Sequence, residues 1–240
     1  MPTVLLVRHG RTAANTSAVL AGWTPGVALD DTGEQQAAAL ATRLAPLPLR
    51  AVVSSPLDRC RQTATALLSG RDGLPLKTDD RLGECRYGDW TGQELKKLAK
   101  DPMWKVVQQH PSAAVFPGDS GEPLAAVQAR AVAAVREWNA RMEDEHGVDA
   151  TWVACSHGDV IKSIVADAMG LHLDLFQRIV VNPCSVTAIR YTATRPFVIR
   201  VNDVGGDVSD LIPPKRRRRG RAAGRATSDA AVGGGVGGGR

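Results

Sequence analysis

Arg8 and His9 stand directly after an apolar run, residues 4–7, and Gly10 follows them. A buried strand has no use for two cationic side chains, so the pair must face a partner beyond the end of the strand. An imidazole can act as a nucleophile that forms a covalent intermediate, and a guanidinium binds phosphoryl oxygens through its fixed fork of donors. The sequence therefore predicts phosphoryl chemistry at this position.

Two further cationic groups follow apolar runs. Arg59 lies just beyond the apolar run at residues 51–55, in the first turn of an expected helix. His157 follows the apolar run at residues 151–155. Because ligands bind beyond the carboxyl ends of parallel strands, we expect these side chains to converge on Arg8 and His9. Helix N-termini add positive charge there, and Gly158 lets the backbone approach a bound anion closely. Such a pocket suits a phosphate dianion.

A leaving alkoxide needs a proton donor, and Glu84 is the best candidate. It precedes an aromatic, glycine-rich segment that could shield it from water and raise its pKa. Four acids near it in the sequence remain alternatives: Asp79, Asp80, Asp89 and Glu94.

The alternation of apolar runs with helical patterns predicts an α/β fold, a three-layer α/β/α sandwich with a mostly parallel central sheet. Strands are expected at 3–7, 51–55, 151–155, 186–192 and 197–203. Helices are expected at about 32–45, opened by a capping box at Thr32, and from Ser55-Pro56 onward, with Ser55 as the N-cap and Pro56 at the first helical position. Two further helices are expected at about 124–145 and from Gly158 onward.

The chain divides into one domain, residues 1–203, and a tail, residues 204–240. An insertion at about 86–123 is expected to lie over the sheet edge, with one short helix near 93–101. The tail is rich in Arg and Gly and is expected to be disordered. Residues 213–240 hold eight basic residues and one acid, so they can bind polyanions weakly. No aromatic residue lies among the arginines, which speaks against specific nucleic-acid binding.

Five stretches of the chain closely resemble the histidine phosphatase superfamily, also called the phosphoglycerate mutase-like family. In chain order they are "VRHGRTAAN", "LDDTGEQQA", "VVSSPLDRCRQTA", "GECRYGDWTG" and "CSHGDVIK". The resemblance implies a phosphoglycerate mutase-like fold with neither a metal nor an organic cofactor. It implies the following roles: His9 as the phosphorylated nucleophile, Arg8, Arg59 and His157 as the phosphate pocket, Asn15 as an additional phosphate contact, and Glu84 as the proton donor.

The chain departs from the family pattern at several positions. Arg11 follows the "RHG" motif, Asp159 follows "SHG", and Lys162 lies one turn further on. Arg11, Asp159 and Lys162 are therefore candidates for shaping substrate preference. Trp23 and Tyr87 are further candidates, as aromatic walls of the pocket.

The function that fits these residues is a metal-independent phosphatase acting on small phosphomonoesters through a phosphohistidine. The insertion is short, which favours the phosphatase branch, but a phosphoglycerate mutase-type phosphomutase is an alternative. A noncatalytic protein that binds phosphorylated ligands or nucleic acid is a second one. The five histidines show no HxH or HExxH spacing, which speaks against a zinc site.

The remaining expectations concern the setting of the protein. Four scattered cysteines and no secretory signal predict a cytoplasmic protein, and no run is long enough to span a membrane. The bias toward Arg, Gly and Ala is typical of a GC-rich bacterial genome. The expected strand at 197–203 could be an outer strand available for pairing in a homodimer.

Overall fold

A six-stranded sheet forms the centre of the protein, in the order β3-β2-β4-β1-β5-β6. The computed structural model describes residues 1–206 and Gly233. The strands are β1 (Thr3–Arg8), β2 (Leu49–Ser54), β3 (Leu76–Thr78), β4 (Thr151–Ser156), β5 (Val186–Tyr191) and β6 (Pro196–Asp203). Strands β3, β2, β4 and β1 pair in parallel, and β5 and β6 add antiparallel pairs. The mostly parallel sheet is thus confirmed.

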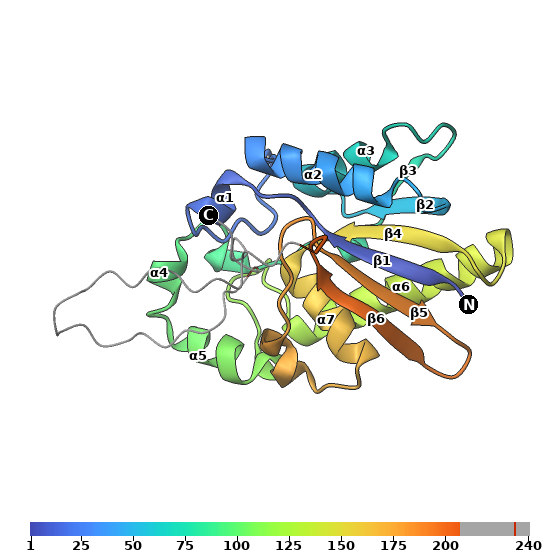
Figure 1. Cartoon of the computed structure of the whole chain (residues 1–240). Coiled ribbons are helices and arrows are strands. Elements are labelled where there is room, and N and C mark those ends of the chain that lie inside the picture. The colour runs from blue at the N-terminus through green and yellow to red at the C-terminus, as the bar shows by residue number, and fades with distance from the viewer. Residues whose placement is uncertain (207–232, 234–240) are drawn as a thin grey trace.

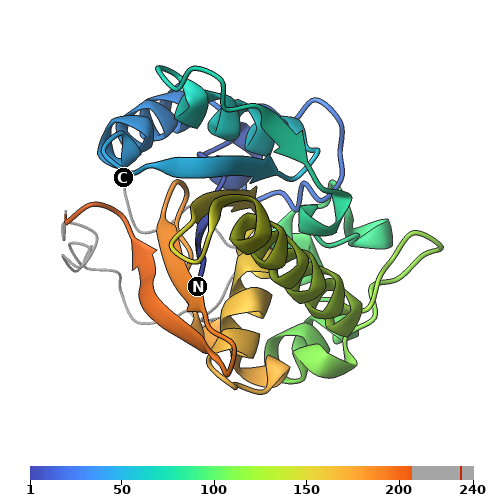
Figure 2. The ribbon, with the colours of Figure 1, turned by 90° about the vertical axis from the view of Figure 1, so that its right-hand side faces the viewer.

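Helices cover both faces of this sheet, as Figures 1 and 2 show. The α-helices are α1 (Ala13–Thr16), α2 (Asp31–Leu44), α3 (Asp58–Leu68), α4 (Leu95–Leu98), α5 (Pro102–Gln109), α6 (Leu124–His146) and α7 (Gly158–Ala168). Short 3-10 turns are η1 (Asp80–Leu82), η2 (Gly88–Trp90), η3 (Pro111–Ala113) and η4 (Leu173–Arg178).

Alternation along β1 builds both halves of the core, because successive strand side chains point to opposite faces. Val4 and Leu6 pack in the cluster that contains the buried side chains of α6 and α7. Leu5 and Val7 pack in the cluster formed with α2 and α3. The sheet is therefore buried on both faces, and the three-layer architecture predicted from the sequence is confirmed.

Both helices of the α2–α3 layer begin differently from the prediction. Asp30 caps α2 by accepting a hydrogen bond from the Gly33 amide, so the helix starts at Asp31 and Thr32 is not its cap. No side chain caps α3, which starts at Asp58. The Ser55 hydroxyl, expected as the cap, lies instead on the ring of His157.

The segment 86–123 holds more helix than expected and lies in a different place. Pro102 begins α5, because proline is tolerated in the first turn of a helix and Asp101 caps it. The segment lies beyond the carboxyl ends of the central strands instead of along an outer strand (Figure 1). Isolated bridges join Val19 to Glu94 and Tyr87 to Gly121. The segment thus helps to enclose the place where the catalytic candidates were expected.

The predicted tail, 204–240, lies largely outside the described residues, so its expected disorder and the domain boundary stay predictions. Within the described part of the chain, no helix combines the length and apolar character needed to cross a membrane.

Candidate active site

The ends of three parallel strands supply the cationic side chains. Arg8 is the last residue of β1 and His9 follows it, Arg59 lies in the first turn of α3 beyond β2, and His157 joins β4 to α7. The rings of His9 and His157 lie 5.3 Å apart between centroids. Arg59 Nη2 lies 3.2 Å from His157 Nδ1. The structure therefore brings together four residues that are spread over 150 positions of the sequence.

The tautomer of His9 follows from a hydrogen bond of its ring. Its Nδ1 lies 2.7 Å from the carbonyl oxygen of Gly10, which can only accept, so Nδ1 carries the proton. The lone pair is left on Nε2, as a nucleophile requires. Burial, then the charges of Arg59 and Arg8, hold the pKa of His9 well below its usual value of 6.5. The ring is therefore neutral at physiological pH.

Gly10 has to be a glycine for a packing reason. A Cβ at this position would meet the Gly33 carbonyl oxygen at 2.6 Å, so the loop after β1 could not lie against α2. The Gly10 amide donates to Thr63 Oγ1 at 3.0 Å, which ties the loop to α3. Together these contacts fix the carbonyl that holds His9.

His157 is held from both sides. Because Arg59 can only donate, Nδ1 of His157 accepts, and the proton sits on Nε2, which donates to Ser55 Oγ at 2.8 Å. Burial, then the charge of Arg59, lowers the pKa of His157 well below 6.5. Sequence reasoning missed Ser55, although its place directly after β2 in "SSPLDR" puts it at the same sheet edge.

Arg8 is completely buried beneath the pocket. Its Nη1 donates to the Val181 carbonyl at 2.8 Å. Burial lowers the pKa of Arg8 to about 10, with the charges of Glu84 and Asp159 opposing that shift. The guanidinium thus stays charged at neutral pH.

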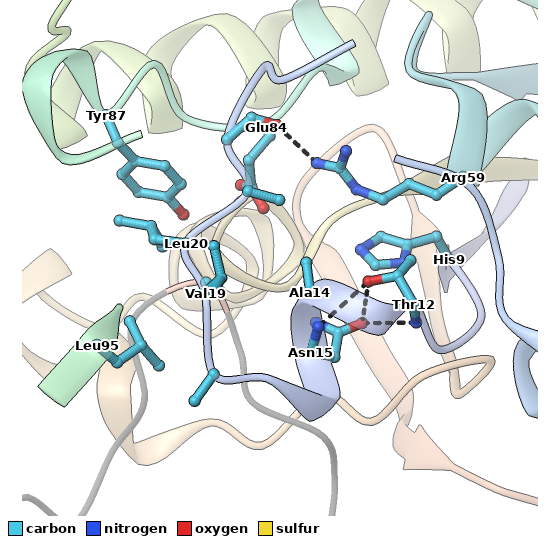
Figure 3. Close-up of a pocket in the computed structure, with 14 residues that line it drawn as sticks. His9, Thr12, Ala14, Asn15, Val19, Leu20, Arg59, Glu84, Tyr87 and Leu95 are labelled. Atoms are coloured by element: carbon cyan, nitrogen blue, oxygen red, sulfur yellow. Dashed lines mark hydrogen bonds between the residues drawn. The ribbon is translucent and has the colours of Figure 1, made fainter. Parts of the chain in front are cut away.

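Glu84 shares the pocket with His9 and Arg59 (Figure 3). Its Oε2 lies 3.7 Å from His157 Nδ1, and its Oε1 accepts from the Cys85 amide at 3.0 Å. Burial first, and then the negative charge of Asp159, raise the pKa of Glu84 to about 7. Of the acids considered from the sequence, Glu84 is the one that lines the pocket.

The backbone around Glu84 is fixed by two side chains. Trp23 Nε1 donates to the Glu84 carbonyl at 2.6 Å. Arg130 donates to the carbonyls of Arg81, Gly83 and Glu84 at 2.7 to 3.0 Å. Sequence reasoning missed Arg130, because nothing near it in the chain points to residues 46 to 49 positions away.

Asn15 lines the pocket and is also the N3 residue of the capping box that opens α1 at Thr12. Its Oδ1 accepts from the Thr12 amide at 3.1 Å and from the Thr12 hydroxyl at 3.0 Å, at the start of α1 (Figure 3). With the oxygen engaged, the amide nitrogen is the group that can meet a phosphate oxygen.

Of the candidates for shaping substrate preference, some line the pocket and others lie outside it. Tyr87 lines the pocket and donates its hydroxyl to Asp159 Oδ2 at 2.9 Å. Arg11 pairs with Asp30 at 2.9 Å, outside the lining. Lys162 lies 3.5 Å from Asp159 and 3.0 Å from Gln177, also behind the lining.

Two other candidates act from outside the lining. Trp23 stacks under the guanidinium of Arg86, whose carbon lies 3.9 Å from the ring centroid. Gly158 is buried as the first residue of α7.

Gly233, which sequence reasoning did not consider, lines the pocket together with His9. Within residues 1–206 and 233, no cluster of three or more His, Cys, Asp or Glu side chains could hold a metal ion.

The model of the histidine phosphatase superfamily (branch 1) matches residues 4–204. The chain belongs to this superfamily. A glucosyl-3-phosphoglycerate phosphatase from Mycolicibacterium vanbaalenii is 32% identical over 174 residues, 71% of this chain and 76% of the relative.

Other histidine phosphatase relatives extend the comparison. A probable phosphoglycerate mutase from Erwinia tasmaniensis is 27% identical, over 88% of this chain and 95% of its own. The solved structure of YhfR from Bacillus stearothermophilus is 29% identical and superposes with a TM-score of 0.76, covering 85% of this chain and 98% of YhfR. The phosphoglycerate mutase-like fold is thus confirmed. The chain is an enzyme of the histidine phosphatase type, and its relatives include both phosphatases and mutase-like proteins.

Proposed function

We propose that this histidine phosphatase hydrolyses small phosphomonoesters without a metal, through a phosphohistidine at His9. The observation that carries the proposal is the neutral His9, with its lone pair on Nε2, beside two arginines and a buried Glu84 whose pKa is about 7. Nucleophile, anion-binding groups and proton donor thus meet in one place.

In the first step, Nε2 of His9 attacks phosphorus and the ester P–O bond breaks. Arg8 and Arg59 donate to the phosphoryl oxygens, and their fixed positive charges stabilise the transition state without reorganising. His157 supports them by holding the Arg59 guanidinium through its Nδ1. Protonated Glu84 gives its proton to the leaving oxygen, which departs as an alcohol.

In the second step, the carboxylate of Glu84 takes a proton from a water molecule. That water attacks phosphorus and the P–Nε2 bond breaks. Inorganic phosphate leaves, while His9 regains its lone pair and Glu84 its proton. The cycle therefore needs no group beyond the side chains named.

Hydrolysis is favoured over phosphoryl transfer between two positions by the character of the pocket. A bisphosphate intermediate needs basic groups for its second phosphate. Beyond Arg59, the lining contributed by the described residues contains no Lys or Arg, and much of it is apolar: Ala14, Ala18, Val19, Leu20, Ala21 and Leu95. The mutase nevertheless remains the second candidate, because a relative named as a probable mutase spans most of the chain.

The test is a phosphate-release screen over a panel of phosphorylated metabolites, with and without a chelator. We expect release that the chelator does not change, and its loss on chelation would overturn the metal-free proposal. Incubation with 3-phosphoglycerate and 2,3-bisphosphoglycerate separates the candidates, since isomerisation indicates a mutase. Full activity in His9→Ala would overturn the catalytic assignment, and a ligand bound without turnover would indicate the noncatalytic alternative.

We further propose that the protein lies in the cytoplasm and comes from a bacterium. All four cysteines are buried free thiols, which suits the reducing cytoplasm of a bacterium. The proposed partner is a small phosphorylated metabolite, with no specific nucleic acid.

We further propose a homodimer through the outer strand β6. Its side chains Phe197, Ile199 and Val201 are 52%, 47% and 38% exposed, so this outer strand presents apolar side chains at the surface. Analytical ultracentrifugation should show a dimer that Ile199→Lys converts to a monomer.

A further inference from the structure

Asp159 is a buried carboxylate that takes no direct part in the proposed mechanism, although its charge helps to raise the pKa of Glu84. Its side chain is only 1% exposed. Oδ1 lies 3.5 Å from Lys162 Nζ, whereas Oδ2 accepts from the Tyr87 hydroxyl at 2.9 Å and from the Gly233 amide at 2.8 Å. Tyr87 and Gly233 both line the pocket. Oδ1 of Asp159 thus faces the ammonium group of Lys162, whereas Oδ2 accepts hydrogen bonds from groups that line the pocket.

The peptide groups of Gly233 show which chemistry this place accepts. The amide nitrogen donates to Asp159 Oδ2, and the carbonyl oxygen lies 3.4 Å from Arg8 Nη2. The carbonyl oxygen therefore stands in for an oxygen of a bound phosphate, and the amide for a donor on the rest of the ligand. The nitrogen and oxygen of one residue are only three covalent bonds apart. A group that reaches Asp159 while Arg8 holds the phosphate must therefore lie close to the ester.

The charge of Asp159 decides which groups fit. A carboxylate only accepts hydrogen bonds, and in a buried place its bonds to hydroxyl or ammonium donors are stronger than in water. A second carboxylate would lack a donor there and would be repelled. Tyr87 cannot relieve this, because its only hydroxyl proton already points to Asp159.

We propose that Asp159 is a specificity-determining residue. It selects phosphomonoesters whose leaving group carries a hydroxyl or an ammonium near the ester, and it rejects those that carry a carboxylate there. This inference rests on the proposed function and deepens it. The names of two relatives contain phosphoglycerate, which carries a carboxylate. This inference therefore gives the chain a different substrate preference from the one that those names state.

The test compares four two-carbon monoesters of phosphate: 2-hydroxyethyl phosphate, O-phosphoethanolamine, ethyl phosphate and phosphoglycolate. They share the phosphate and differ in the group that would meet Asp159. We expect kcat/KM to be highest for the first two, intermediate for ethyl phosphate and lowest for phosphoglycolate. In Asp159→Asn, the ratio of phosphoethanolamine to phosphoglycolate should fall by about tenfold or more, because the amide can also donate.

Two other variants separate recognition from structure. Tyr87→Phe keeps the carboxylate and should keep the preference, and Asp167→Asn, on the same helix, should leave every constant unchanged. If Asp159→Asn fails to fold, the double variant Asp159→Asn with Lys162→Met removes both charges of the buried pair and takes its place.

Binding of the same four compounds to His9→Ala, measured by calorimetry, gives a readout without turnover. An unchanged order of affinity after adding Asp159→Asn would overturn the role of Asp159 while leaving the proposed function intact. Conversely, absence of phosphate release from every ester by the wild-type chain would overturn the proposed function. The binding order would then still decide on Asp159.

Discussion

Glu84 Oε2 lies 3.7 Å from His157 Nδ1, and both side chains are almost completely buried. The carboxyl group that gives up a proton therefore sits beside the ring that holds Arg59 in place. Burial and the nearby Asp159 raise the pKa of Glu84 to about 7, so at neutral pH a large part of it is protonated. The same environment lowers the pKa of His9, which keeps the nucleophile unprotonated.

The first prediction concerns the pH dependence of kcat/KM. Above about pH 7, Glu84 loses its proton in the free enzyme, so kcat/KM for an alkyl phosphate should fall about tenfold per pH unit. His9 stays neutral down to below pH 6.5, so it adds no loss near neutrality. With p-nitrophenyl phosphate, whose leaving group needs little protonation, the fall should be much smaller. Equal falls for both substrates would contradict the assignment of Glu84.

The second prediction is that Glu84→Gln trades activity for stability. Folded Glu84 keeps its proton up to about pH 7, whereas the unfolded chain gives it up near 4.5, so ionisation above 4.5 favours unfolding. At pH 8 the variant should be more stable by about 2 to 3 kcal/mol, and at pH 4 equally stable. Its kcat for an alkyl phosphate should fall by about 100-fold or more. Urea unfolding at both pH values checks the sign, and equal stability at pH 8 would contradict it.

A third prediction tests the support behind the acid. Arg130→Met removes the donors to three carbonyls around Glu84, so kcat for an alkyl phosphate should fall about tenfold, with less effect on p-nitrophenyl phosphate. Arg136→Met, an exposed arginine on the same helix, is the matched control. Loss of both activities to the same degree would point to a general structural defect instead.

A fourth prediction concerns the peptide of Gly233 inside the pocket. Gly233 has a φ of 74°, and a Cβ there would meet Leu20 Cδ1 at 2.9 Å, so Gly233→Val should leave the pocket. Without this competitor, KM should fall by up to about tenfold for every substrate, with kcat unchanged. Gly73→Val is the control, since that glycine has a similar φ but open space around it. A KM equal to that of the wild type would mean that the peptide does not compete.

The convergence of Arg8, His9, Arg59 and His157 could be predicted, because three continuous apolar runs mark buried parallel strands whose ends must meet. The short strand β3 was missed, since Leu76–Thr78 has three residues and no buried side chain. Helix α5 was missed, although Pro102 suits the first turn of a helix and Asp101 before it is a good cap. Local patterns therefore indicate elements well when they are long and apolar.

Contacts between distant positions were harder to predict. Ser55 was assigned to a helix cap, but the fold places its hydroxyl on His157, 102 positions away. Arg130 looks like any helix arginine until the chain before Glu84 folds against α6. Arg11 looked like a substrate contact, yet Asp30 and Thr32 take its donors. Such pairings depend on tertiary packing, which spacing alone does not encode.

The central claim is that His9 carries the phosphoryl group between the two steps. The most direct measurement mixes the full-length enzyme with a hydrolysed monoester, quenches in alkali, where phosphohistidine survives, and locates the modification by peptide mass spectrometry. The account predicts a phosphoryl group on His9, enriched in Glu84→Gln if the second step is slowed more than the first, and absent from His9→Ala. A phosphoryl group on another residue, or full turnover by His9→Ala, would contradict it.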